Sequence, residues 1–179
     1  MNDEKKEREQ QQKADEKRQI SALRSGHTGA ARAALEEIRI SGRVNMLPEI
    51  FEMLLETHNQ ELLKTGSALL NDLKAKDAGH YFIDALRDPR FQPIHKILVS
   101  ACWQNGLEFK GALLTFADIL ISENYETAIE AYTVIENNLG NISDKDTLLL
   151  LDRLQKGETA AEEPKRSLIS SMIAVVRNY

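Results

Sequence analysis

The sequence has few of the residues that mark several protein classes. One cysteine in 179 residues cannot form an internal disulfide framework and indicates a reducing compartment. Nine glycines and four prolines are few for the turns of an all-β fold. No apolar run approaches the ~18 residues of a membrane span, and the charged N-terminus lacks the apolar stretch of a signal peptide. We therefore expect a cytoplasmic protein with no membrane segment.

Sequence motifs of the common enzyme classes are also missing. There is no Gly-x-Gly-x-x-Gly, no Walker-type Gly-Lys loop and no Gly-x-Ser-x-Gly elbow. The four histidines are His27, His58, His80 and His95, and no two of them have the i,i+4 spacing of a helical zinc site. Cys102 falls in an apolar stripe, which indicates a core residue. We expect a non-enzymatic protein with no metal and no cofactor.

Charge is distributed unevenly along the chain. Residues 1–26 carry seven basic and six acidic side chains, while residues 27–179 carry sixteen basic and twenty-two acidic ones. An acidic body repels the phosphates of nucleic acids and of anionic lipids. This argues against nucleic acid and membrane surfaces as partners.

Apolar residues recur at helical spacing from residue 31 to residue 176, and no strict alternation is long enough for a strand. Among the expected core stripes are those of residues 129, 132 and 135, of residues 148, 151 and 154, and of residues 168, 172, 175 and 176. Gly42, Gly106 and Gly140 each follow a stripe, as left-handed C-terminal caps do. The pattern predicts an all-α protein with about ten helices.

The stripes repeat along the chain. A large apolar residue stands four positions before a leucine in four places, at Phe51 and Leu55, Phe82 and Leu86, Phe116 and Leu120, and Leu150 and Leu154. We expect four stacked helical hairpins at about 27–57, 59–88, 91–122 and 124–156, and a closing helix at about 160–178. Such stacking produces a solenoid in which each layer covers the apolar face of its neighbour.

The segments Phe82-Ile-Asp-Ala-Leu-Arg-Asp-Pro-Arg90 and Ala33-Ala-Leu-Glu-Glu-Ile38 resemble HEAT repeats, of the wider armadillo-like group, and the resemblance covers about residues 27–156. It implies a right-handed α-α superhelix. Because HEAT proteins are mostly scaffolds and adaptors, it also implies protein binding as a tendency of the class.

Residues 1–19 are rich in Glu, Lys, Gln, Asp and Arg and have almost no apolar side chain. Such a segment buries too little surface to offset its ordering entropy. We expect residues 1–19 to be a disordered or frayed helical arm. The chain becomes helical near Ile20, this helix stops at Gly26, and one helical-repeat domain covers residues 20–179.

Candidate binding residues come from the repeat alignment. Asp84, Asp118 and Asp152 stand two positions before the aligned leucine, so they point away from the buried stripe. Glu49, Glu52 and Glu56 lie near the same position in the first repeat, and the single Trp103 stands where other repeats are polar. We expect these residues to bind an unidentified protein, through a basic or amphipathic segment, in a groove lined by the second helices. A solvated polar face is the alternative interpretation of the Asp series, and a covered crevice that of Trp103.

Two other functions are compatible with the sequence. The first is a HEAT-like DNA-binding protein or DNA-base glycosylase. Some HEAT-like proteins are DNA-base glycosylases that use an Asp and aromatic residues, a pair that Trp103 and an Asp such as Asp118 could imitate. Alternatively, Met172, Ile173, Val175 and Val176 could expose apolar surface and form a homo-oligomer through the terminal helices.

Overall fold

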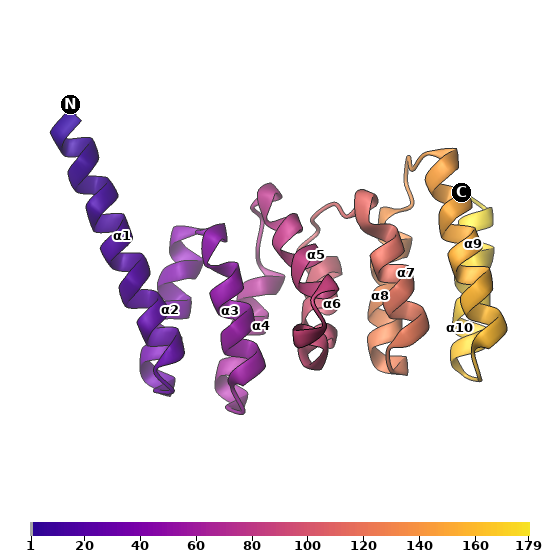
Figure 1. Ribbon diagram of the computed structural model, residues 1–179, viewed down its shortest axis with the longest axis horizontal. Helices are drawn as coiled ribbons and strands as arrows, with labels where there is room; N and C mark the ends of the chain where they lie inside the picture. Colours follow the sequence, from indigo (N-terminus) through magenta and orange to yellow (C-terminus); the bar gives the residue numbers. More distant parts are fainter. Residues whose placement is uncertain (1) are drawn as a thin grey trace. The chain divides into compact units, whose positions relative to one another are not determined.

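A computed structural model describes the backbone of residues 2–179 and the side chains of residues 5–179 (Figure 1). Within residues 2–179 the chain forms ten α-helices, four short 3₁₀-helices and no β-strand, which confirms the all-α prediction. The α-helices are α1 Asn2–Arg24, α2 Thr28–Ser41, α3 Leu47–Glu56, α4 Gln60–Asn71, α5 Gly79–Arg87, α6 His95–Gln104, α7 Leu113–Ser122, α8 Tyr125–Asn138, α9 Asp144–Ala160 and α10 Lys165–Arg177. The 3₁₀-helices are η1 Val44–Met46, η2 Lys76–Ala78, η3 Pro89–Ile94 and η4 Lys110–Ala112.

The chain divides into two compact units, Met1–Leu73 (unit 1) and Lys74–Tyr179 (unit 2). Sequence analysis instead placed one domain over residues 20–179. The division falls inside the predicted hairpin 59–88, so α4 belongs to unit 1 and α5 to unit 2.

Unit 1 consists of two helix pairs. Helix α1 packs on α2 and α3 packs on α4, while α1 also contacts α3 and α2 contacts α4. Contacts of this kind place α1 and α3 in one layer and α2 and α4 in the other. Each pair thereby covers the apolar face of its neighbour.

Unit 2 repeats this arrangement with three pairs, α5 with α6, α7 with α8, and α9 with α10. One layer contains α5, α7 and α9, and the other contains α6, α8 and α10, because contacts run along each set in that order. In Figure 1 the α6–α7 and α8–α9 connections lie at the same end of the helices and the α7–α8 connection at the opposite end. Helices α7 and α9 therefore run in the same direction.

The helix pairs are shifted by one helix from the predicted hairpins. The segments 27–57, 91–122 and 124–156 each join helices that belong to neighbouring pairs, and the helix predicted to close the chain is the partner of α9. Short connections occur on both sides of most helices, so sequence spacing alone does not distinguish the two groupings. The helices predicted to come second in each hairpin are thus the first helices of the observed pairs.

Aromatic side chains fill the centre of unit 2. Phe109 lies between Phe82 and Phe116, with edge-to-face ring contacts at centroid distances of 6.3 and 5.6 Å. All three rings are buried, as is the aligned Leu150. In unit 1 the aligned Phe51 is also buried, so each phenylalanine of the repeat frame is a core residue.

Two predicted stripes are wrong in part. Ile129 of α8 and Leu148 of α9 were expected in the core and are 43% and 68% exposed. Helix α8 packs with a face of smaller and polar side chains, which comprises Thr127, Ala128, Ala131, Val134, Ile135 and Asn138. Helix α9 has four consecutive leucines, of which only Leu150 is buried, because a helix directs successive residues to different sides.

Two of the three predicted glycine caps are confirmed. Gly42 and Gly106 have φ of 64° and 70°, the left-handed conformation that glycine adopts without steric cost. The prediction for Gly140 is wrong, because the positive φ of that turn, 61°, belongs to Asn141. Asparagine also tolerates this conformation, so either residue can end a helix.

The first helix begins well before the predicted start of helical structure in the N-terminal segment. Helix α1 begins at Asn2, whereas the sequence placed the onset near Ile20. Met1, the first residue of the predicted arm, lies outside the described residues. In α1 the buried side chains are Gln19 and Leu23, so the contacts of α1 concentrate in its last two turns.

No helix within residues 2–179 is both long enough and apolar enough to cross a lipid bilayer.

Candidate functional site

The three aspartates of the predicted series lie on one layer of unit 2. Asp84 is on α5, Asp118 on α7 and Asp152 on α9, and all three side chains are exposed. Each stands on the side of its helix opposite the buried residues, as their spacing from the core stripe predicts.

Two of these carboxylates are already engaged in ion pairs. Asp118 lies 3.0 Å from Arg153 of α9, and Asp152 lies 2.6 Å from Lys156 on its own helix. Arg87, one turn after Asp84, donates to the Thr115 hydroxyl of α7 at 3.2 Å. Basic side chains thus alternate with the aspartates, and the surface is mixed in charge rather than acidic.

Exposed leucines accompany the charged residues on α7 and α9. Leu114 is 37% exposed, and Leu148 and Leu149 are 68% and 43% exposed. Leu114 lies one turn before Asp118, and Leu149 lies one turn before Arg153. Because α7 and α9 run in the same direction and the Asp118–Arg153 pair connects them, Leu114 and Leu149 lie at the same level. We call Leu114, Asp118, Leu148, Leu149, Asp152 and Arg153 the α7/α9 surface.

Sequence analysis missed the leucines of the α7/α9 surface. Leu148 was assigned to the core, and the apolar run from Leu148 to Leu151 gave no sign of which side chains face solvent. A run of four leucines in a helix is itself the available signal, because one helix side cannot bury all of them.

Trp103 lies on the other layer. It is on α6, is 38% exposed, and donates its indole N–H to the Glu130 carboxylate of α8. Asp118 is on the exposed side of α7 in the opposite layer, so Trp103 and Asp118 do not meet in one site. Asp118 is therefore not the aspartate that could pair with Trp103 in the DNA-base glycosylase alternative.

The three candidate glutamates belong to α3 of unit 1. Glu49 accepts two hydrogen bonds from the Arg24 guanidinium of α1, both at 2.8 Å, so its carboxylate ties α1 to α3. Glu52 is half-buried and Glu56 is exposed. Glu56 also lines a cavity of about 330 Å³ beside Arg24, His58 and Asn59.

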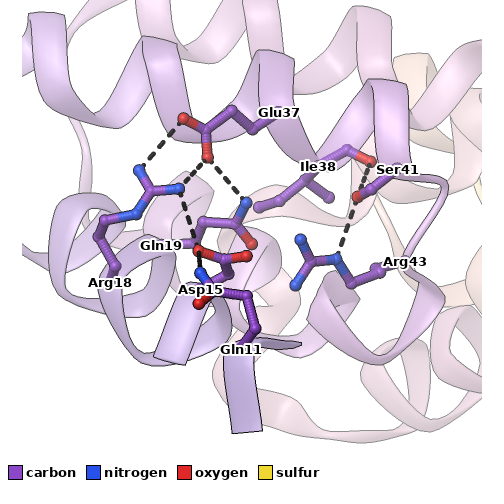
Figure 2. Close-up of polar contacts among 8 residues, drawn as sticks. All are labelled: Gln11, Asp15, Arg18, Gln19, Glu37, Ile38, Ser41 and Arg43. Atoms are coloured by element: carbon purple, nitrogen blue, oxygen red, sulfur yellow. Dashed lines mark hydrogen bonds and ion pairs between the residues drawn. The ribbon is translucent and has the colours of Figure 1, made fainter. Parts of the chain in front are cut away.

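Glu37 of α2 is the centre of a polar cluster that holds α1 (Figure 2). Arg18 donates to its two carboxylate oxygens at 3.1 and 2.6 Å, and the Gln19 amide donates at 2.9 Å. The hydrogen bonds from Arg18 and then from Gln19 lower the pKa of Glu37 to about 2, with a further contribution from the charge of Arg43. The cluster is a structural contact between α1 and α2.

The terminal helix does not expose the apolar residues proposed for oligomerisation. Met172, Ile173 and Val176 are buried, and Val175 is half-buried, because α10 packs on both α8 and α9. The expectation that these residues expose apolar surface is wrong for the three buried ones.

Chemistry-bearing groups are sparse in the part of the chain that the structure describes. No group of three or more His, Cys, Asp or Glu side chains there could hold a metal ion. Cys102 is buried, and this burial raises its thiol pKa well above the usual value. His95 places Nδ1 3.0 Å from the Glu123 carboxylate, and both side chains are largely buried at the start of α6 and the end of α7.

Comparison of the sequence with protein-family models gave no match, and comparison with curated proteins gave none either.

Proposed function

We propose that the chain is a HEAT-like helical-repeat protein that binds another protein and has no enzymatic activity. The layered helix pairs within each unit support a solenoid, which would be a right-handed superhelix. The observation that carries the binding proposal is the α7/α9 surface, where three exposed leucines lie beside paired charges. Neighbouring exposed apolar side chains with a polar rim are typical of interaction sites.

The chemistry of this surface favours an amphipathic helix as the bound segment. Leu114, Leu148 and Leu149 offer apolar contacts, while Asp118 and Arg153 offer one charge of each sign at the edge. An amphipathic helix presents apolar anchors at i, i+3, i+4 and i+7 and polar groups beside them. Asp84, which makes no ion pair in the described residues, adds attraction for a basic residue at one end of the segment.

Site-specific photo-crosslinking tests this proposal. A photoreactive residue placed at Leu149 should crosslink to the partner in cells. The same residue at Ile129 should not, although both positions are 43% exposed. Ile129 is on α8 in the other layer, so it controls for exposure and for stickiness of the probe. Crosslinking to the same partner from Ile129, with none from Leu149, would place the binding surface on the layer of α6, α8 and α10 and contradict the proposal.

A pair of substitutions provides a second test. Leu148→Asp with Leu149→Asp should leave the helical circular dichroism unchanged, because both side chains face solvent. It should also abolish capture of the crosslinked partner. Ile129→Asp is the matched control, and equal loss of capture in the two variants would contradict the proposal.

A further inference from the structure

A cavity of about 450 Å³ lies in unit 2, where the C-terminal ends of α6 and α8 meet the connections that follow them. Its lining comes from the last turn of both helices, from the α6–η4 connection with η4, and from the α8–α9 connection. Sites for small molecules have volumes of about 300–1,000 Å³, so the cavity is large enough for one. No lining residue belongs to the α7/α9 surface.

Trp103 forms an aromatic wall of this cavity, and it is 38% exposed. Its indole N–H donates to the Glu130 carboxylate of α8, which fixes the orientation of the ring. That hydrogen bond uses the single donor of the indole, so the exposed surface that remains is apolar. Trp103 therefore offers a ligand a flat apolar contact whose direction is already fixed.

Two asparagines of the lining have accessible amide groups. Asn137 and Asn141 are exposed, and neither side chain makes a hydrogen bond within the part of the chain that the structure describes. Each amide supplies one acceptor oxygen and two N–H donors to a ligand in the cavity. Asn138 is different, because it is buried and its Oδ1 and Nδ2 are bonded to the Phe109 N–H and the Val134 carbonyl oxygen. The amides available for binding are therefore those of Asn137 and Asn141.

The charged groups of the lining balance each other. Glu108 and Lys110 have opposite charges, their carboxylate and ammonium lie 3.9 Å apart, and both side chains are exposed. The remaining residues that line the cavity in the described part of the chain are uncharged, so the lining has no net charge. Such a site gives no general attraction to anions or to cations, and we expect its ligand to be neutral.

We propose that this cavity binds a neutral sugar. A pyranose ring has an apolar face of C–H groups, which packs on Trp103, and hydroxyl groups around its edge. Each hydroxyl both donates and accepts hydrogen bonds, as the amides of Asn137 and Asn141 do. The sugar thus matches three properties of the lining, which are a fixed apolar ring, unpaired amides and no net charge. This ligand site goes beyond protein binding, and its success or failure leaves the α7/α9 surface untouched.

Intrinsic fluorescence of the intact chain tests the proposal, because Trp103 is the single tryptophan. Glucose, galactose, mannose and N-acetylglucosamine are titrated separately, with sorbitol, a polyol without a ring, as the control. At least one of these sugars should give a saturable change in the tryptophan emission, and sorbitol should give none. The side-chain NH₂ resonances of Asn137 and Asn141 should shift with the same midpoint in nuclear magnetic resonance spectra. Emission that responds to none of the sugars, or equally to sorbitol, overturns the proposal.

Three variants separate binding in the cavity from nonspecific effects of the sugar. Asn137→Ala and Asn141→Gly each remove one amide and should weaken binding about three- to tenfold. Glycine suits position 141 because the backbone φ there is 61°, so this variant keeps the turn. Asn178→Ala changes an exposed asparagine outside the lining and should leave the affinity unchanged. Equal weakening by all three variants, or no weakening by either lining variant, refutes the site.

Discussion

The two units differ in the apolar side chains that they leave exposed, although ion pairs join helices in both, as Asp118–Arg153 does in unit 2. In unit 1, arginines reach across to carboxylates on other helices, in the pairs Arg18–Glu37, Arg24–Glu49, Arg32–Glu61 and Arg39–Asp72. Among its described side chains, Ile40 is the large apolar residue that is exposed. In unit 2 the corresponding exposed residues are Trp103, Leu114, Tyr125, Ile129, Leu148, Leu149 and Tyr179.

This difference indicates which unit has surface available for a partner. Each exposed ion pair contributes little to stability, about 0–1 kcal/mol. In unit 1, however, these pairs give the arginines and carboxylates partners within the unit. Covering exposed leucines and aromatic residues with a partner lowers the free energy, because apolar surface is removed from water. The comparison therefore favours unit 2 for the proposed partner binding, while the polar contacts of unit 1 join its own helices.

The largest expected effect comes from removing an aromatic ring from the core of unit 2. Phe116→Ala deletes the ring that Phe109 contacts at 5.6 Å and should destabilise the protein by about 3–5 kcal/mol. Chemical denaturation monitored by circular dichroism measures this change. Leu149→Ala is the control on the same unit, and its effect should stay within about 0.5 kcal/mol because the side chain is exposed. Comparable losses from the two variants would mean that Leu149 packs in a core.

A second prediction compares two buried helical glycines, one in each unit. A Cβ on Gly157 would lie 2.4 Å from Ile121 Cγ1 and 2.5 Å from its Cδ1, so Gly157→Ala should cost about 1–3 kcal/mol. A Cβ on Gly66 would meet Leu54 Cδ2 at 2.8 Å, which is the end of a flexible side chain. Because alanine also gains about 1 kcal/mol in helix propensity, Gly66→Ala should be close to neutral.

Thermal unfolding of the two glycine variants provides the measurement. Gly29→Ala serves as the control, since a Cβ placed at this position would meet nothing within 4 Å, and it should be neutral or slightly stabilising. A neutral Gly157→Ala would contradict the close packing of α9 on α7 at Ile121.

Periodicity predicted the helices well because apolar spacing is a local property of the chain. The stripe of Ala31, Ala34, Leu35 and Ile38 and that of Leu113, Phe116 and Leu120 are buried as expected. It failed where two helix sides were equally apolar, as at Leu148, and where small or polar residues formed the core face, as at Thr127 and Asn138. Which side of a helix is buried depends on the neighbouring helices that pack against it, and the local sequence pattern carries no information about them.

The same reason limited the prediction of the site. The exposure of Asp84, Asp118 and Asp152 followed from their spacing to the buried leucines, and the structure places them on one layer. Their ion pairs depend on Arg153 and Lys156, whose positions relative to Asp118 and Asp152 come from the packing of α7 and α9. Trp103 was predicted to bind the same partner segment because the repeat gives the order of the helices along the chain but not the layer to which each helix belongs.

A third prediction concerns the polar cluster of unit 1 and its response to acid. The pKa of Glu37 is about 2 in the folded protein, below its ordinary value of 4.5, so the carboxylate favours the folded state above pH 4.5. That contribution should decline as the pH falls from 4.5 towards 2. The protection factors of the α1 amides, which are corrected for the intrinsic pH dependence of exchange, should therefore decrease over this range, ahead of those of α2.

Glu37→Gln should produce the same decrease in α1 protection factors at neutral pH and remove their pH dependence between pH 4.5 and 2. Glu36→Gln is the matched control, because Glu36 is the neighbouring residue on α2 and pairs with Arg39 of its own helix. Unchanged exchange in α1 after Glu37→Gln would mean that Leu23 and the Arg24–Glu49 contact hold the helix without the cluster.

The smallest expected effect is the coupling between Asp118 and Arg153. A double-mutant cycle with Asp118→Asn and Arg153→Gln should give about 0.2–1 kcal/mol, because both side chains are about half exposed. A value near zero would leave the Asp118 carboxylate free for a basic residue of the partner. A value near the upper limit would mean that a partner must compete with Arg153 for it, so Asp84→Asn should then reduce partner affinity at low salt more than Asp118→Asn does. The cycle thus determines which aspartate a binding experiment should change first.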